Sequence, residues 1–337
     1  MKYYIITGEP SGDMHAANLV HQIRKQDNNA VIRAFGGERL ISEGVSIAKD
    51  IRTIAFMGFW NVLKNLSVIR SNLKFCKEDI SIFKPDALVL VDYPGFNLRI
   101  AEYAKNNRIP VFYYISPKVW AWNKRRISSI KKFVDHLLVI FPFEVEFYKK
   151  YKLDVKYVGN PLLDEINKKD YKFTYKSAKP IIGLLPGSRK QEIDSILPEM
   201  LTVVDKYPSY QFVIACSNIL GKEYYQSFIK NKNVILVFNE TYGLLENAKV
   251  ALVTSGTATL EAALFKVPQV VCYKTNWLSY FLAKFLVAIN YVSLVNIILK
   301  KEVVKELIQG NLNKKNLIKE LDFLLDDKKD LVKDYEI

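Results

Sequence analysis

Short apolar runs alternate with helix-length segments through most of this 337-residue chain, and the pattern occurs twice. A parallel strand returns to its sheet through a crossover helix, so this alternation predicts a doubly wound α/β sheet in each half. The first-half strands are expected at residues 3–7, 30–35, 87–91, 111–115 and 137–139, and the second-half strands at 181–185, 211–215, 234–237, 250–253 and 269–273. Two Rossmann-like domains of this kind face each other across a cleft and bind ligands at the carboxyl ends of their strands.

A polar, lysine-rich stretch at residues 167–179 has weak periodicity and separates the two halves. Domain boundaries fall in such stretches, so we interpret it as an interdomain linker. The expected organisation is a first domain at 1–166, the linker, a second domain at 180–310 and a helical tail at 311–337.

The net charge of +14, from 49 Lys and Arg against 35 Asp and Glu, indicates anionic partners. Nucleic acid, phosphorylated metabolites and an acidic membrane surface all remain open on charge alone. No zinc-finger spacing, aromatic RNA-binding motif or continuous basic helix is present, so nucleic-acid binding is only the electrostatic default. The first residues contain no leader-like pattern, which predicts a cytoplasmic protein. Cys76, Cys216 and Cys272 are scattered along the chain in apolar neighbourhoods, which predicts that they are core residues.

Two strand ends in the second half have the composition of anion-binding turns. Ser255-Gly256-Thr257 follows one strand and opens a helix, where free backbone N–H groups and the helix dipole favour a diphosphate. Glu261 lies one helical turn further on and could reach a ribose diol. An ordinary turn capped by Thr257 is the alternative.

Another strand of the second half ends in Gly187-Ser188-Arg189, which combines a tight turn with a guanidinium suited to phosphate oxygens. Glycines at strand-to-helix turns are common, so one such loop is weak evidence. Two in one half favour a nucleotide-phosphate site.

In the first half, three strand ends carry polar or aromatic residues that we expect to face the cleft. The candidates are Ser11, Gly12 and Asp13 after the first strand, Asp92 and Asn97 after the third, and Ser116 and Trp120 after the fourth.

Six motifs resemble those of lipid-A-disaccharide synthases, and the match runs in register from about Gly8 to about Gln309. They are Gly8-Glu-Pro-Ser-Gly-Asp13, Asp92-Tyr-Pro-Gly-Phe-Asn97, Tyr114-Ile-Ser-Pro-Lys-Val-Trp-Ala-Trp122, Leu185-Pro-Gly-Ser-Arg189, Ser255-Gly-Thr-Ala-Thr-Leu-Glu261 and Tyr291-Val-Ser-Leu-Val-Asn296. The resemblance implies a GT-B fold and an inverting glycosyltransferase. It would move 2,3-diacylglucosamine from UDP to 2,3-diacylglucosamine 1-phosphate, known as lipid X, and form the β-1,6-linked lipid A disaccharide.

The resemblance also implies roles for residues. Asp92 would be the general base, although an Asp before Tyr-Pro-Gly can equally cap the following turn, and Asp13 is a weaker rival that also suits the first turn of a helix. Arg189 would counter the leaving-group charge, Asn296 and Gln309 match segments near the donor site, and no metal or other cofactor is expected.

An enzyme acting on acylated sugars must reach a membrane surface, and residues 56–70 suit that role. The apolar positions follow helical spacing, with an aromatic residue suited to an interface: Phe59, Trp60, Val62, Leu63 and Leu66. An ordinary amphipathic helix packed on the sheet remains the alternative. A second apolar run at residues 277–299 is interrupted by polar residues and is not expected to span a membrane.

The expected partners are UDP-2,3-diacylglucosamine, lipid X and the anionic cytoplasmic face of the inner membrane, to which the protein would attach peripherally. No nucleic acid is expected, and a homodimer is left open. Two other functions stay open: a peptidoglycan-type GT-B transferase that uses UDP-N-acetylglucosamine, and a basic nucleic-acid-binding protein without enzymatic activity.

Overall fold

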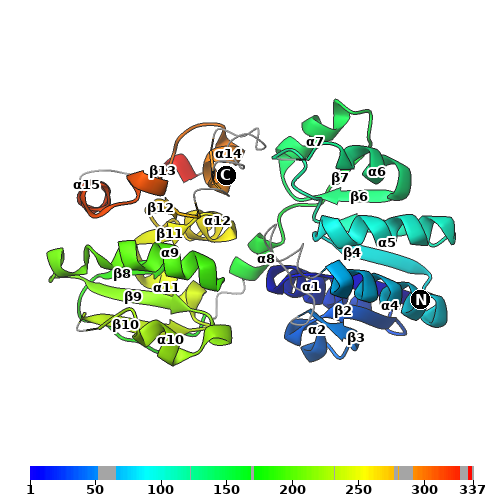
Figure 1. Ribbon diagram of the computed structural model, residues 1–337, viewed down its shortest axis with the longest axis horizontal. Helices are drawn as coiled ribbons and strands as arrows, with labels where there is room; N and C mark the ends of the chain where they lie inside the picture. Colours follow the sequence, from blue (N-terminus) through cyan, green and yellow to red (C-terminus); the bar gives the residue numbers. More distant parts are fainter. Residues whose placement is uncertain are drawn as a thin grey trace. The chain divides into compact units, whose positions relative to one another are not determined.

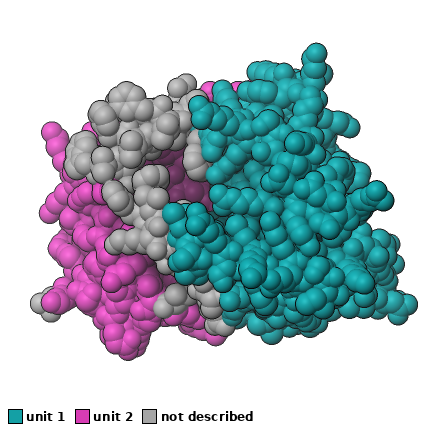
Figure 2. All heavy atoms as spheres, turned by 45° about the vertical axis from the view of Figure 1, so that its right-hand side comes forward, with its two compact units in different colours: residues 1–161 teal, residues 162–337 magenta. Residues whose placement is uncertain are grey.

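The computed structural model describes residues 1–51, 66–121, 123–167, 171–230, 232–276, 280, 291–326 and 333–335. The chain divides into two compact units, unit 1 at residues 1–161 and unit 2 at residues 162–337, which Figure 2 colours separately. Each unit has its own hydrophobic core and its own sheet. Figure 1 shows the two sheets, with most of their strands labelled.

The sheet of unit 1 has the order β3-β2-β1-β4-β5-β6-β7, with every pair parallel. Its strands are β1 (Lys2–Ile6), β2 (Val31–Gly36), β3 (Ser46–Asp50), β4 (Ala87–Val91), β5 (Val111–Tyr114), β6 (His136–Val139) and β7 (Lys156–Tyr157). All five predicted strands are present. The two edge strands, β3 and β7, were not predicted, because neither has a buried apolar run.

Helices connect these strands. They are α1 (Pro10–Gln26), α2 (Glu38–Ser42), α4 (Leu66–Phe83), α5 (Pro94–Asn106), α6 (Arg126–Phe133) and α7 (Pro142–Lys149). Proline opens α1, α5 and α7, where its missing N–H costs no helical hydrogen bond. Helix α4 packs Cys76 and Ile80 into the core. Its first residue, Leu66, is exposed.

The sheet of unit 2 has the order β10-β9-β8-β11-β12-β13 and is also parallel throughout. Its strands are β8 (Ile181–Leu185), β9 (Gln211–Cys216), β10 (Val234–Phe238), β11 (Ala248–Thr254), β12 (Gln269–Tyr273) and β13 (Lys305–Ile308). Its helices are α8 (Leu162–Ile166), α9 (Lys190–Leu201), α10 (Lys222–Gln226), α11 (Thr241–Asn247), α12 (Thr257–Leu264), α14 (Leu294–Leu299) and α15 (Lys314–Leu324). The five predicted strands are again present, and β13 is an addition.

Helices cover both faces of this second sheet. Alternate residues of a strand point to opposite faces, and in β8 Ile182 and Leu184 join one apolar cluster while Ile181 and Leu185 join another. The first cluster includes buried residues of α9 and α15, and the second includes buried residues of α11 and α12. The sheet is therefore doubly wound, as predicted. The three cysteines are buried and free, also as predicted.

The described residues of the expected linker pack on unit 2. The Thr174 N–H donates to Glu240 Oε2 at 2.8 Å, and Phe173 and Tyr175 contact the cluster under α11. A Cβ at Gly243 would lie only 2.4 Å from the Lys172 carbonyl oxygen, so glycine lets this segment cross α11 closely.

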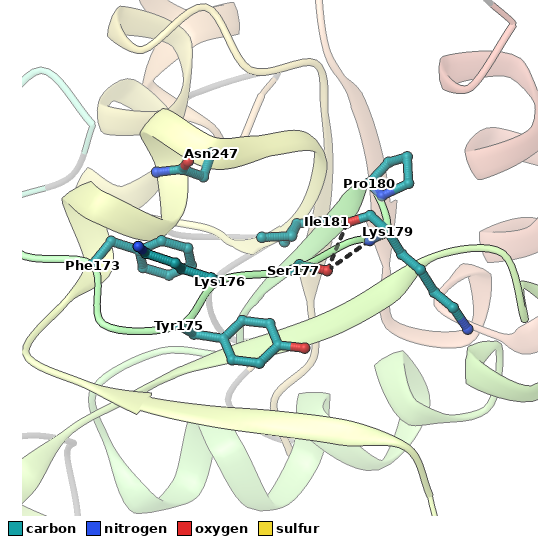
Figure 3. A pocket seen from close by; sticks show the side chains of 8 residues that line it. All are labelled: Phe173, Tyr175, Lys176, Ser177, Lys179, Pro180, Ile181 and Asn247. Atoms are coloured by element: carbon teal, nitrogen blue, oxygen red, sulfur yellow. Dashed lines mark hydrogen bonds between the residues drawn. The ribbon is translucent and has the colours of Figure 1, made fainter.

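A hollow of about 380 Å³ lies beside the same segment. Figure 3 shows the residues that line it: Phe173, Tyr175, Lys176, Ser177, Lys179, Pro180, Ile181 and Asn247. It lies at the amino end of β8, because Ile181 is the first residue of that strand. No helix among the described residues is long and apolar enough to cross a membrane.

Candidate active site

The turn after β11 presents a helix start that is not capped by any side chain among the described residues. Gly256 is the N-cap residue of α12, with a φ of 136° that other residues rarely adopt, and Thr257 is the first helical residue. The alternative in which Thr257 caps the helix is therefore wrong. Ser255 Oγ donates to the Val292 carbonyl oxygen at 2.7 Å, which directs this hydroxyl away from the first turn of α12. The backbone of this turn can bind an anion.

A second helix start lies at the same edge of the sheet. Leu185, the last residue of β8, pairs with Val253 of β11, so the turns that follow the two strands are neighbours. Gly187 has a φ of 112°, and a Cβ there would lie 2.6 Å from Glu192 Oε2. Ser188 leads to Arg189, the N-cap residue of α9. The two predicted anion turns are thus brought together.

Arg189 is half exposed, and its Nη1 donates to Glu192 Oε1 at 3.0 Å. An exposed ion pair of this kind contributes little to stability, about 0 to 1 kcal/mol. A diphosphate could therefore compete for the guanidinium at small cost. The sequence did not identify Glu192 as the ion-pair partner of Arg189.

Glu261 lies one turn into α12 and is partly buried. Burial raises its pKa to about 7, while a hydrogen bond from Tyr242 has the opposite effect. The Tyr242 hydroxyl donates to Glu261 Oε1 at 3.1 Å. The carboxyl group can therefore accept hydrogen bonds from a diol when it is ionised.

Asn296 is fully buried, and its side-chain amide bonds only to neighbouring protein groups. Nδ2 donates to the Val304 carbonyl oxygen and to Glu306, and Oδ1 accepts from the N–H groups of Val303 and Val304. Glu306 in turn accepts from the N–H groups of residues 292 and 293. Asn296 thus holds the segment that receives the Ser255 hydroxyl, and its amide is already fully used.

Gln309, at the carboxyl end of β13, is also buried and used internally. Its Oε1 accepts from the Thr275 N–H at 2.9 Å, and its Nε2 donates to the Thr275 carbonyl oxygen at 3.0 Å. These two bonds join the segment after β12 to the segment after β13. Gln309 shapes the edge of the sheet in unit 2.

In unit 1, Asp92 follows β4 in a left-handed conformation. Its φ is 44° and that of Tyr93 is 48°, and two such residues in succession store backbone strain, which often marks functional sites. The Asp92 carbonyl oxygen accepts from Asn97 Nδ2 at 2.7 Å and from the Tyr113 hydroxyl at 2.5 Å. The N-cap residue of α5 is Tyr93, so Asp92 does not occupy the capping position.

The electrostatic setting of Asp92 suits a proton acceptor. Burial raises the pKa of its carboxyl group, and the positive charges of Lys118 and Arg126 partly oppose that shift. Burial lowers the pKa of Arg126, and the nearby Tyr113 and Asp92 partly oppose that shift. Neither cation was among the sequence candidates, because only the fold brings the segment after β5 and the start of α6 to Asp92.

Asp13 is committed to a structural role. Its buried carboxylate accepts from the Gly37 N–H at 2.6 Å and the Arg39 N–H at 2.9 Å, at the start of α2. Burial raises its pKa and these bonds oppose the shift. The neighbouring Ser11 is exposed, and Gly12 is buried with a Cβ position 3.5 Å from Thr7 Cβ.

Ser116 and Trp120 are held by Glu144, a buried carboxylate that sequence reasoning missed. Ser116 Oγ donates to Glu144 Oε1 at 2.6 Å, and Trp120 Nε1 donates to the same oxygen at 3.3 Å. Glu144 Oε2 accepts from the N–H groups of Ile140 and Phe141. The available signal was a glutamate in the first turn of a helix opened by Pro142.

Four of the predicted membrane residues, Phe59, Trp60, Val62 and Leu63, lie outside the described residues. Leu66 is described and is 42% exposed. Among the residues that the structure describes, no group of three or more His, Cys, Asp or Glu side chains is arranged to hold a metal ion.

Comparisons with known proteins agree on a family. A family model described as lipid-A-disaccharide synthetase matches residues 3–336. The lipid-A-disaccharide synthase of Syntrophus aciditrophicus is 38% identical over 330 residues, which is 94% of this chain and 86% of that protein. The enzyme of the same name from Myxococcus xanthus is 34% identical, with the same two coverages.

Solved structures resemble the fold across the whole chain. The UDP-GlcNAc 2-epimerase of Neisseria meningitidis, bound to UDP-GlcNAc, has a TM-score of 0.70 at 15% identity and covers 100% of this chain and 95% of its own. The glycotransferase of kitacinnamycin has a TM-score of 0.68 at 12% identity and covers 99% and 92%. The predicted GT-B fold class is thereby confirmed.

Proposed function

The chain belongs to the lipid-A-disaccharide synthase family of glycosyltransferases, and on that basis we propose that it transfers 2,3-diacylglucosamine from UDP to lipid X. The products are UDP and the β-1,6-linked lipid A disaccharide 1-phosphate. The observation that carries this proposal is the pair of adjacent helix starts after β8 and β11. They provide a setting for a sugar nucleotide diphosphate.

In the proposed donor site, the backbone N–H groups around Ser188 and Thr257 bind the diphosphate. Arg189 exchanges its contact with Glu192 for the phosphate oxygens and offsets the charge that develops on departing UDP. Glu261 accepts hydrogen bonds from the ribose hydroxyls. The epimerase of similar fold binds a UDP-sugar, which supports a nucleotide site in this fold.

On the acceptor side, Asp92 takes the proton of the attacking 6-hydroxyl group. Direct displacement at the anomeric carbon inverts its configuration and needs such a base. The burial that raises the Asp92 pKa makes the carboxylate a stronger base, and Lys118 and Arg126 keep it ionised.

We further propose that transfer needs no metal ion, because two helix starts and Arg189 can supply the stabilisation that a cation would give to the diphosphate. The segment at residues 56–70 attaches the protein to the anionic cytoplasmic face of the inner membrane, where both acylated substrates reside. Leu66, exposed at the start of α4, supports an apolar surface there.

The test is a transfer assay with purified protein, UDP-2,3-diacylglucosamine and lipid X in detergent micelles. We expect equimolar UDP and disaccharide, with equal rates in buffer and in EDTA. Absence of product would refute the function, and loss of activity only in EDTA would refute metal independence. Turnover of UDP-N-acetylglucosamine with a polyprenyl-linked acceptor, or tight salt-sensitive polynucleotide binding without turnover, would support the two alternative functions.

A further inference from the structure

Tyr242, on α11, bonds to the carboxyl group proposed to bind ribose. Its hydroxyl donates to Glu261 Oε1 at 3.1 Å, and both side chains are partly buried. Burial raises the Tyr242 pKa well above its usual value, and the neighbouring Glu261 adds to the shift. The hydroxyl therefore keeps its proton and remains a donor at any pH at which the protein is assayed.

Two further rings fix the orientation of Tyr242. Tyr171 packs edge-on against it with centroids 5.4 Å apart, and Phe265 lies 5.5 Å away. Tyr171 and Phe265 also contact each other, at 5.3 Å, so the three rings form a closed cluster. The Tyr171 hydroxyl donates to the Glu165 carbonyl oxygen at 3.0 Å, which anchors the cluster to α8. A ring packed on two sides has little rotational freedom.

The arrangement leaves half of the carboxylate available. Tyr242 bonds to Oε1, whereas Oε2 receives no hydrogen bond from the described residues. An ionised carboxylate has about four acceptor positions, so it can hold Tyr242 and still accept two hydroxyl groups of a diol.

We propose that Tyr242 is a positioning residue for the nucleotide, holding the Glu261 carboxylate so that it accepts hydrogen bonds from the ribose 2′- and 3′-hydroxyls. The inference rests on the proposed function of the donor site. Tyr242 itself touches no reacting atom.

The proposal predicts a specific pH dependence. The titratable group that acts on Glu261 is Tyr242 of α11. Tyr242 is itself close to two other titratable groups, Glu165 of α8 and Tyr171. The Glu261 pKa is about 7, so its ionised fraction rises about tenfold between pH 6 and pH 8. Removing the Tyr242 hydroxyl removes a bond to the charged form, which raises the Glu261 pKa further, by on the order of one unit.

The experiment measures the affinities of UDP and of 2′,3′-dideoxy-UDP by calorimetry from pH 5.5 to pH 9. Both ligands carry the same phosphates, so phosphate titration cancels when the dissociation constant of 2′,3′-dideoxy-UDP is divided by that of UDP. This ratio reports the contribution of the ribose hydroxyls to binding. In the wild type this ratio should rise through pH 7. In Tyr242→Phe the rise should move up by roughly one unit, with a loss of about fivefold at pH 7. The loss should narrow at pH 9 but remain, because the ionised carboxylate still lacks the bond that orients it.

Tyr207→Phe is the matched control, because it removes another hydroxyl that bonds to a carboxylate, that of Asp322, elsewhere in unit 2. Its ratio should follow the wild type at every pH. A Tyr242→Phe curve equal to that of the wild type would overturn the inference, as would full recovery at pH 9, which would mean that the hydroxyl affects only the charge of Glu261 and not its orientation. Failure of the wild type to bind UDP at all would instead refute the proposed donor site.

Discussion

Replacing Glu144 with alanine tests the buried network that shapes the segment after β5. The carboxylate accepts four hydrogen bonds, from Ser116 at 2.6 Å, Trp120 at 3.3 Å, the Ile140 N–H at 3.1 Å and the Phe141 N–H at 3.0 Å. All four donors lose their acceptor in Glu144→Ala.

The expected decrease in the free energy of unfolding depends on which of these donors can find another acceptor. The Ser116 hydroxyl still contacts the Tyr148 hydroxyl, at 3.2 Å. The indole N–H and the two backbone N–H groups have no other acceptor within the described part of the chain. Each buried donor left unpaired costs about 1 to 3 kcal/mol. Water entering the vacated space offsets part of that cost, so we expect a loss near the lower bound for three donors, about 3 kcal/mol.

The assay is urea unfolding followed by tryptophan fluorescence. Three of the four tryptophans, at positions 60, 120 and 122, belong to unit 1, so the signal reports mainly on that unit. With an m-value of about 2 kcal/mol per molar urea, the midpoint should fall by about 1.5 M. Glu146→Ala, an exposed position on the same helix, is the control and should leave the midpoint within about 0.3 M of the wild type. Equal midpoints for the two variants would refute the assigned role of Glu144.

Four further predictions concern catalysis, pH and the membrane. Asp92→Asn should lower kcat by about 10² to 10⁴ with little change in donor affinity, and near-normal turnover in the transfer assay would exclude Asp92 as the base. Arg189→Ala should lower kcat by about 10² to 10³, and a change in KM alone would mean that Arg189 binds substrate without aiding departure of UDP. The raised Glu261 pKa means that the folded state holds a proton more tightly, so wild-type stability should fall as the pH rises from about 4.5 through about 7. Urea unfolding at pH 5 and pH 8 should show a larger decrease for the wild type than for Glu261→Gln, and parallel curves would contradict this. Leu63→Ser with Leu66→Ser should increase the fraction that remains in solution over anionic vesicles, and unchanged partitioning would favour a core helix.

The interior strands were predictable from the sequence because buried parallel strands are continuous apolar runs, as in Ile181–Leu185. Three of the four edge strands, β3, β7 and β13, were not predicted; Lys156–Tyr157, for example, is exposed and its pairing depends on the strand beside it. The fourth, β10, was predicted because it is an apolar run. The turns at Gly187 and Gly256, which lead into α9 and α12, could be identified because glycine before a helix signals a tight turn.

The side-chain partners could not be predicted in this way. Asp13 contacts a helix start 24 residues later, and Glu144 lies 28 residues from Ser116, distances at which sequence spacing carries no information on contact. The resemblance assigned Asn296 and Gln309 to the donor site, but only the structure shows that their amides are used within unit 2. Nothing in the sequence distinguishes Tyr242 from other aromatic residues on helices, because its hydrogen-bond partner Glu261 lies 19 residues away.

A crystal structure of the protein with UDP would show directly whether the two helix starts of unit 2 bind the diphosphate. We expect a diphosphate within hydrogen-bonding distance of the backbone N–H groups at the starts of α9 and α12, with the ribose hydroxyls on Glu261. A diphosphate bound elsewhere, such as in the hollow at the amino end of β8, would contradict it.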